Sequence, residues 1–192
     1  MLYQISAIAI LLAFYSFYIR KIIIQRKQSI KTNQMGMGNK EKKVLWTERI
    51  MSVATVLTIV AEVISIFLTD GFFTIPIRII GIVIGVLAVV VFAMATITMK
   101  NSWRVGIPEE KTNIITSGIY GFSRNPAFVG FDLLYISILL LFFNIPLLLI
   151  SVWAMIMLHL QILQEEKWLS VTFGDEYEAY RRKVCRYIGR KA

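Results

Sequence analysis

Apolar and polar positions along this chain are grouped in long blocks. A membrane-spanning helix needs roughly 17–25 mostly apolar residues, and five blocks approach or reach that length. They cover residues 2–19, 50–69, 75–99, 127–143 and 146–163. The last two cannot form one helix, because Pro146 would remove a backbone hydrogen bond and clash with the preceding turn. The pattern therefore predicts five membrane-spanning helices, the last two forming a tight hairpin.

The composition favours an all-α, polytopic integral membrane protein. Hydrophobic residues make up 57% of the 192 residues, and 17% are charged, whereas ordinary chains carry about 25%. The mean hydropathy is +0.66. No linker rich in Pro, Gly and Ser divides the chain, so we expect one membrane domain over residues 1–192. Residues 1–99 would supply three spans, and residues 100–192 the hairpin and short cytoplasmic C-terminal helices.

The basic residues fall into three groups that predict an orientation. Of the 21 Lys and Arg residues, nine lie in 20–49 and seven in 167–191. Four more are Lys100, Arg104, Lys111 and Arg124. Five spans put all three groups on one side and leave only Arg78 elsewhere. Because cytoplasmic loops are rich in Lys and Arg, we expect a plasma-membrane protein with its N-terminus outside and its C-terminus cytoplasmic. This bias explains the net charge of +9 without nucleic acid.

Two polar flanks of the hairpin are the candidate site. Residues 117–126 precede the fourth block, and residues 164–180 follow the fifth. Only Asn144-Ile145-Pro146 joins the two blocks, so both flanks return to the same membrane face. The chain has one cysteine, Cys185, and one histidine, His159. It therefore offers no internal disulfide and no spacing typical of a metal site.

Each feature of these flanks also has a structural interpretation. Asn125-Pro126 is a favourable helix start, although a helix N-terminus also offers free N–H groups to an anion. Glu165 and Glu166 could be solvated acids at the membrane boundary. His159 could be a hydrogen-bonding residue of the bundle or a base.

Two features inside the spans are predicted to be structural. Glu62 should face the bundle interior, since intramembrane acids are costly. Gly81-x-x-x-Gly85 is a close-packing pattern, for which packing within the chain is favoured over a homodimer. A monomer among membrane lipids is expected.

The ordered motifs of the C-terminal half resemble the isoprenylcysteine carboxyl methyltransferase family, whose relatives include the phospholipid methyltransferases. The resemblance covers roughly residues 100–186 and indicates a short prokaryotic or archaeal member. It rests on Ser102-Trp103-Arg104, Ile115–Tyr120, Arg124–Gly130, Glu165-Glu166, Phe173–Tyr177, Tyr180 and Val184. It implies S-adenosyl-L-methionine as the methyl donor and S-adenosyl-L-homocysteine as the product.

The resemblance also implies roles for individual residues. Glu166 is expected near the reaction centre, and Arg104 is the candidate for holding an acidic acceptor. The family commonly has Arg-His-Pro where this chain has Arg124-Asn125-Pro126, and some members have an arginine at the position of Gln161. The implied cofactor contacts are the backbone of Asn113, Ile114 and Ile115, the ring of Tyr120, the helix start Asn125, Pro126, Ala127 and Phe128, and the carboxylate of Glu165.

The favoured reaction is methyl transfer to a carboxylate of a lipophilic or lipidated acceptor that enters from the bilayer. A carboxylate is ionised at neutral pH, so no strong base is needed. Three alternatives stay open. One is phospholipid or amine methylation, with Glu166 and His159 as bases. Another is an NADPH-dependent sterol-type reductase using Arg181-Arg182-Lys183. The third is a non-enzymatic membrane scaffold that dimerises through the Gly81 face.

Overall fold

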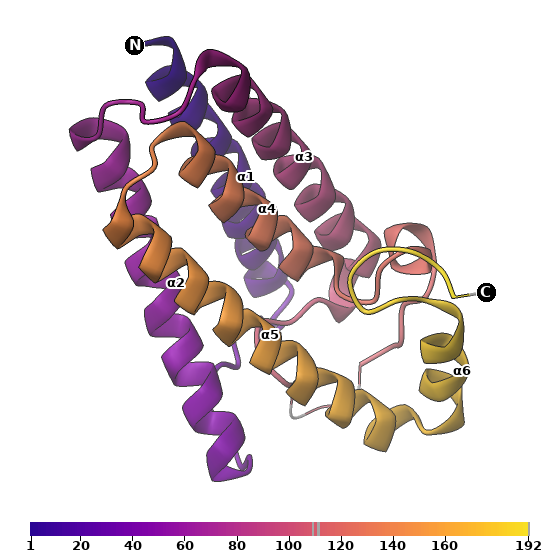
Figure 1. Cartoon of the computed structure of the whole chain (residues 1–192). Helices are drawn as coiled ribbons and strands as arrows, with labels where there is room; N and C mark the ends of the chain where they lie inside the picture. The colour runs from indigo at the N-terminus through magenta and orange to yellow at the C-terminus, as the bar shows by residue number, and fades with distance from the viewer. Residues whose placement is uncertain (109, 111, 192) are drawn as a thin grey trace.

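The computed structural model describes residues 1–108, 110 and 112–191, and it is built from helices that alternate in direction (Figure 1). The 3-10 turns η1 (Lys100–Ser102) and η2 (Gly118–Gly121) lie between the third and fourth α-helices. The chain folds as α1 (Leu2–Lys27), α2 (Lys42–Leu68), α3 (Ile75–Met99), α4 (Pro126–Leu141), α5 (Ile145–Phe173) and α6 (Asp175–Lys183).

Four of the described helices, α1, α2, α3 and α5, are long and apolar enough to cross a membrane. The 16 residues of α4 extend about 24 Å, less than the roughly 30 Å hydrocarbon core. The membrane prediction is confirmed, but the count of five full spans is not. Large apolar side chains such as Val53, Val60, Val83 and Val90 are about half exposed, as a lipid-facing surface requires.

The predicted hairpin is tight at its turn and opens toward its other end. Asn144 caps α5 by accepting a hydrogen bond from the Leu147 amide at 2.9 Å. Beyond the turn, α4 packs mainly along α3, and α5 packs mainly along α2. The two helices consequently diverge toward the end of the bundle opposite the N-terminus (Figure 1).

Glycines in α3 permit the close approach of α4 and α1. Ser137 on α4 donates a hydrogen bond to the Gly81 carbonyl at 2.7 Å. A Cβ at Gly85 would lie 2.5 Å from Ser137 Oγ and 2.6 Å from Ile10 Cδ1. The prediction that this pattern packs within the chain is confirmed. The α3 face that contains Gly81 and Gly85 is therefore covered by α4 and α1, and it is not available for the dimer of the non-enzymatic scaffold alternative.

Substituting Gly85 with leucine is expected to destabilise the bundle by about 1–3 kcal/mol, the usual cost of overpacking. The change can be measured by thermal unfolding in detergent. Val83→Leu is the matched control, because Val83 is 61% exposed and its extension should have little effect. Equal unfolding temperatures for the two variants would contradict the assigned packing.

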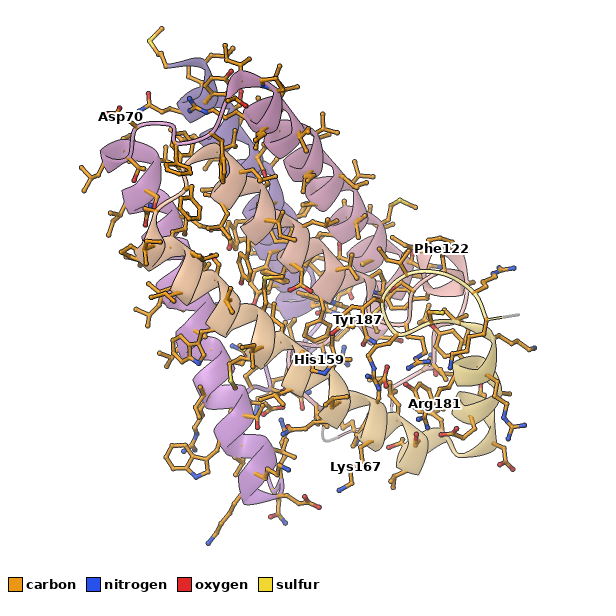
Figure 2. The ribbon with its side chains drawn as sticks, in the orientation of Figure 1. Asp70, Phe122, His159, Lys167, Arg181 and Tyr187 are labelled. Atoms are coloured by element: carbon orange, nitrogen blue, oxygen red, sulfur yellow. The ribbon has the colours of Figure 1, made fainter. Side chains whose placement is uncertain are left out.

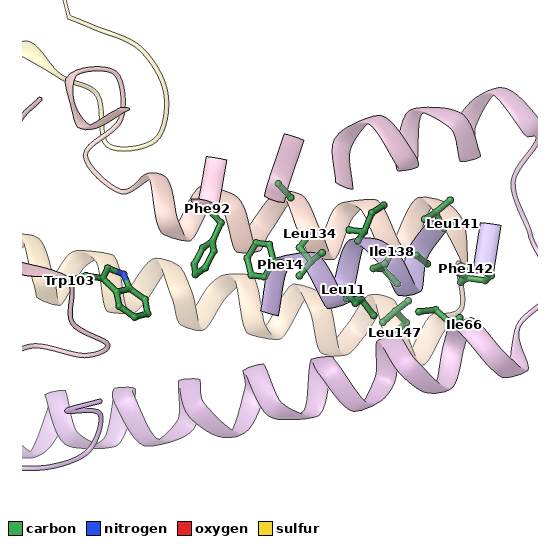
Figure 3. Packing of buried hydrophobic residues seen from close by; sticks show 13 residues of the cluster. Leu11, Phe14, Ile66, Phe92, Trp103, Leu134, Ile138, Leu141, Phe142 and Leu147 are labelled. Carbon is green, nitrogen blue, oxygen red and sulfur yellow. The ribbon is translucent and has the colours of Figure 1, made fainter. Parts of the chain in front are cut away.

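The core of the bundle fixes the position of the connection after α3 (Figure 3). Phe14 of α1 stacks on Phe92 of α3 with ring centroids 4.3 Å apart, and Phe131 of α4 packs edge-on against both. Trp103 is buried at the same cluster and packs edge-on against Phe92. The connection is thereby anchored beneath the α4 start.

The three basic segments meet at one end of the molecule. The Val105 amide donates to the Thr32 carbonyl at 3.0 Å, and the Gln34 amide donates to the Val105 carbonyl at 2.9 Å. These bonds join the α1–α2 connection to the segment after α3, and the C-terminal tail lies at the same end (Figure 1). Lys111, counted in the second basic group, lies outside the described residues.

A buried carboxylate holds these connections together. Glu48 of α2 is fully buried. It accepts hydrogen bonds from the amides of Gly36 at 2.7 Å and Ile107 at 2.8 Å. It also pairs with Lys40 at 2.8 Å. This cluster was not predicted from the sequence, where Lys40 stood only among the basic residues that indicate the orientation.

Candidate functional site

The two polar flanks meet through a buried ion-pair network, as the sequence predicts. Glu166 Oε1 accepts hydrogen bonds from Arg124 Nη2 at 2.6 Å and from Asn125 Nδ2 at 3.1 Å. Its other oxygen, Oε2, accepts from Arg186 Nη2 at 2.9 Å. Arg124 and Glu166 are both nearly buried. This carboxylate therefore joins α5, the start of α4 and the C-terminal tail.

The start of α4 is left without a side-chain cap. Asn125 occupies the N-cap position, as predicted, but its side chain makes no capping hydrogen bond. Its amide nitrogen donates instead to Glu166 and, at 3.2 Å, to the Arg186 carbonyl. Because Pro126 has no N–H, the first free backbone donors of the helix belong to Ala127 and Phe128. Such an uncapped N-terminus can bind an anion.

The C-terminal tail wraps around the α4 start. The Arg124 side chain donates to the Val184 carbonyl at 2.9 Å, and the Arg124 amide donates to the Cys185 carbonyl at 3.1 Å. Gly174, at φ +52°, separates α5 from α6, which places the tail beside the site. The hydrogen bonds to Glu166 raise the pKa of the Arg186 guanidinium, so this pair stays charged.

Tyr120 and Tyr180 pin η2 against the tail. Tyr180 Oη donates to the Tyr120 carbonyl at 2.7 Å. Burial raises the pKa of the Tyr120 phenol, and the nearby charge of Glu165 raises it further. Tyr120 therefore remains a neutral hydrogen-bond donor. The predicted cofactor-pocket aromatic and the predicted cofactor acid are therefore electrostatic neighbours.

Glu165 lies apart from the Glu166 network. Its Oε1 accepts a hydrogen bond from Gln161 Nε2 at 3.0 Å, and its charged neighbours include Glu48 and Lys40. Adjacent positions on a helix point in directions about 100° apart. The two acids consequently face different partners, and Glu165 has no cationic hydrogen-bond partner among the described residues.

A second polar group lies in the opening between α4 and α5. His159 Nδ1 hydrogen-bonds Tyr187 Oη, and the two rings stack with centroids 6.0 Å apart. Figure 2 shows Tyr187 of the tail reaching the His159 side of α5. Asp132 of α4 is an electrostatic neighbour of Tyr187. The tail therefore closes the side of the site that the diverging helices leave open.

The remaining predicted residues lie farther along the connection before α4. Asn113 and Ile114 line a polar hollow with Phe173 and Glu176, and Ile114 also packs against the Tyr177 and Tyr180 cluster. Ile115 follows in the same segment and is partly buried. These residues lie beside the C-terminal helices, and their contact with the cofactor stays a prediction.

Arg104 is held by its own chain segment. Its Nη1 donates to the carbonyls of Asn101 at 2.6 Å and Trp103 at 2.9 Å. It makes no described contact with Glu166. Arg186 and Tyr187, by contrast, lie in the site but were not identified from the sequence. The only feature of the sequence that could have indicated them is the adjacent Arg186-Tyr187 pair within the basic C-terminal tail.

Comparisons with known proteins agree with the motif resemblance. Residues 79–171 match the sequence model of the isoprenylcysteine carboxyl methyltransferase family. The chain is also similar to the protein-S-isoprenylcysteine O-methyltransferase of Schizosaccharomyces pombe, with 38% identity over 72 residues. That match covers 37% of this chain and 30% of the relative. The matched family segment contains α4, nearly all of α5 and the whole Arg124–Glu166 pair.

Proposed function

We propose that this chain, whose residues 79–171 match the sequence model of the isoprenylcysteine carboxyl methyltransferase family, is a membrane methyltransferase of that family. It uses S-adenosyl-L-methionine to methylate the carboxylate of a lipophilic or lipidated acceptor. The reaction takes place at the cytoplasmic face of the plasma membrane, with the N-terminus outside. The observation that carries the proposal is the buried network in which Glu166 holds the uncapped α4 start at the basic end of the bundle, with Tyr120 and Glu165 as electrostatic neighbours nearby.

The donor set fits the proposed cofactor. The free amides of Ala127 and Phe128 suit its carboxylate, and Glu165, which has no cationic hydrogen-bond partner among the described residues, suits its ammonium. Tyr120, with the segment at Asn113 and Ile114, would hold the adenosyl part. When bound, the cofactor supplies a methyl group on a positively charged sulfur.

The residues of the chain would act mainly by positioning. Glu166 keeps Arg124 and Asn125 fixed at the helix start, so that the free amides point at one place. The space between α4 and α5 would admit the acceptor from the bilayer, and the Tyr187 tail would exclude water. An ionised carboxylate needs no deprotonation before it attacks, which agrees with a site whose acids are hydrogen-bonded and whose only histidine is bonded to Tyr187.

Calorimetric titration of the detergent-solubilised protein with S-adenosyl-L-homocysteine tests the cofactor assignment. We expect saturable binding that Glu165→Ala weakens about tenfold or more, since it removes a charged hydrogen-bond acceptor. Asp175→Ala, an exposed acid on α6, is the matched control and should bind normally. Competition by NADPH, or equal binding by both variants, would contradict the assignment.

Methyl transfer from labelled S-adenosyl-L-methionine tests the acceptor class. We expect transfer to N-acetyl-S-farnesyl-cysteine and none to its methyl ester, which lacks the free carboxylate. Labelling of phosphatidylethanolamine instead would move the assignment to amine methylation.

A further inference from the structure

A groove separate from the proposed catalytic site opens between the basic ends of α2 and α5. Its volume is about 670 Å³. It lies on a different face of α5 from Glu166. Its lining includes Lys43 and Val44 of α2, Leu163, Lys167 and Trp168 of α5, the acid Glu41 that precedes α2, and Ile107 and Pro108 from the connection after α3.

This groove combines an apolar floor with a basic rim. The Lys43 side chain is exposed, and its ammonium group makes no hydrogen bond or ion pair among the described residues. Lys167 lies 4.0 Å from Glu41, but both side chains are about three-quarters exposed, so this contact is weak. Lys40 is turned inward to Glu48. The rim thus keeps cationic charge that no described residue fully neutralises.

The groove lies at the depth of the lipid headgroups. The 27 residues of α2 and 29 residues of α5 extend about 40 Å or more, beyond the roughly 30 Å hydrocarbon core. The charged residues of both helices are concentrated at the groove end, so the excess length lies there. Trp168 lines the groove, and Trp46, 62% exposed, lies one turn from Lys43. Tryptophan is enriched at membrane interfaces.

The groove is held in place by contacts within the protein. At its floor Gln164 Nε2 donates to Thr47 Oγ1 at 2.8 Å and links α5 to α2. At its end the Ile107 amide is fixed by Glu48 at 2.8 Å. These contacts join the two helices and the connection after α3, so that the walls do not depend on a bound molecule.

We propose that this groove binds an anionic phospholipid from the surrounding leaflet. The phosphate lies between Lys43 and Lys167, and an acyl chain follows Val44 and Leu163 into the bilayer. Cationic side chains near an anionic leaflet attract such headgroups, and the apolar floor at the hydrocarbon edge favours a lipid over a soluble acidic peptide. Lipid binding in this groove does not require methyl transfer, so this proposal can be tested independently of the proposed function.

Native mass spectrometry of the full chain in detergent tests the site. The protein is titrated with phosphatidylglycerol or with phosphatidylcholine that carries the same acyl chains. We expect phosphatidylglycerol to bind preferentially. Lys43→Glu combined with Lys167→Glu should weaken its binding about tenfold or more, whereas Lys31→Glu with Lys183→Glu should change it less than about twofold. The control pair carries the same change in charge on exposed lysines outside the groove.

A milder double variant, Lys43→Gln with Lys167→Gln, distinguishes lost lipid binding from misfolding. It should weaken phosphatidylglycerol binding to an intermediate degree. Its circular dichroism spectrum should match that of the unmodified protein. Three results would overturn the proposal. One is equal affinity for the two lipids, and another is equal loss in the groove and control variants. The third is displacement of phosphatidylglycerol by a soluble polyglutamate peptide at comparable concentration.

Discussion

Replacing Glu166 with alanine is expected to lower the free energy of unfolding by about 3–5 kcal/mol and to abolish binding of S-adenosyl-L-homocysteine. The variant leaves Arg124, which is nearly buried, without its counter-charge, and removing one partner of a buried pair has this cost. It also frees Asn125 and Arg186, so the α4 start and the tail lose the group that joins them. Thermal unfolding in detergent and calorimetric titration measure the two effects.

Two further variants separate this role from a general effect of losing an acid. Glu178→Ala removes a surface acid that accepts a hydrogen bond from Ser170 and pairs with the half-exposed Arg181, and such surface contacts contribute little to stability. Glu166→Gln keeps the shape but not the charge, and it should lie between the two. If Glu166→Ala unfolds like Glu178→Ala, the network does not hold the site together.

The meeting of the two flanks could be predicted because it follows from chain direction alone. Two helices joined by a short turn return to one face, whatever their detailed packing. Arg124 and Glu166 are 42 positions apart, yet the antiparallel course of α4 and α5 brings them to the same end of the bundle. The close packing at Gly81 and Gly85 was predictable for a similar reason, since small residues one turn apart permit helix contact.

The partners of the site residues could not be predicted, because they depend on where the tail runs. The Gly189 amide donates to the Phe122 carbonyl at 2.8 Å. Such backbone hydrogen bonds determine the path of the C-terminal tail, but they do not depend on side chains and so cannot be recognised in the sequence. They bring Arg186 to Glu166, although the sequence marks Arg186 only as one of several tail charges.

Two local features of α4 and α5 also differ from what the hydrophobic pattern indicates. The side chain of Asn125 bonds to the Glu166 carboxylate and not to its own helix, because a charged acceptor makes the stronger hydrogen bond. The α5 helix continues past residue 163, where the apolar block ends, and stops at Phe173. Its polar residues remain good helix formers, so the helix ends where Gly174 allows the turn and not at the membrane boundary.

Replacing Glu62 with methionine is expected to stabilise the protein by about 1–3 kcal/mol. Glu62 is fully buried in α2, and neither carboxylate oxygen has a hydrogen-bond partner among the described residues. An unsatisfied polar group costs free energy in either protonation state, by about 1–3 kcal/mol in mutational data. Methionine has a similar unbranched shape and fills irregular interior space. Thermal unfolding in detergent should therefore shift to a higher temperature.

Glu48→Met is the matched comparison, because it removes an equally buried acid from the same helix. Glu48 is satisfied by the amides of Gly36 and Ile107 and by Lys40. Its loss would leave the buried Ile107 amide, the partly buried Gly36 amide and the nearly buried Lys40 ammonium without this partner, and so should destabilise the protein by about 3–5 kcal/mol. Opposite signs for two acids of equal burial would establish hydrogen-bond satisfaction as the deciding factor. If Glu62→Met instead destabilises the protein, Glu62 has a polar partner that the described residues do not include.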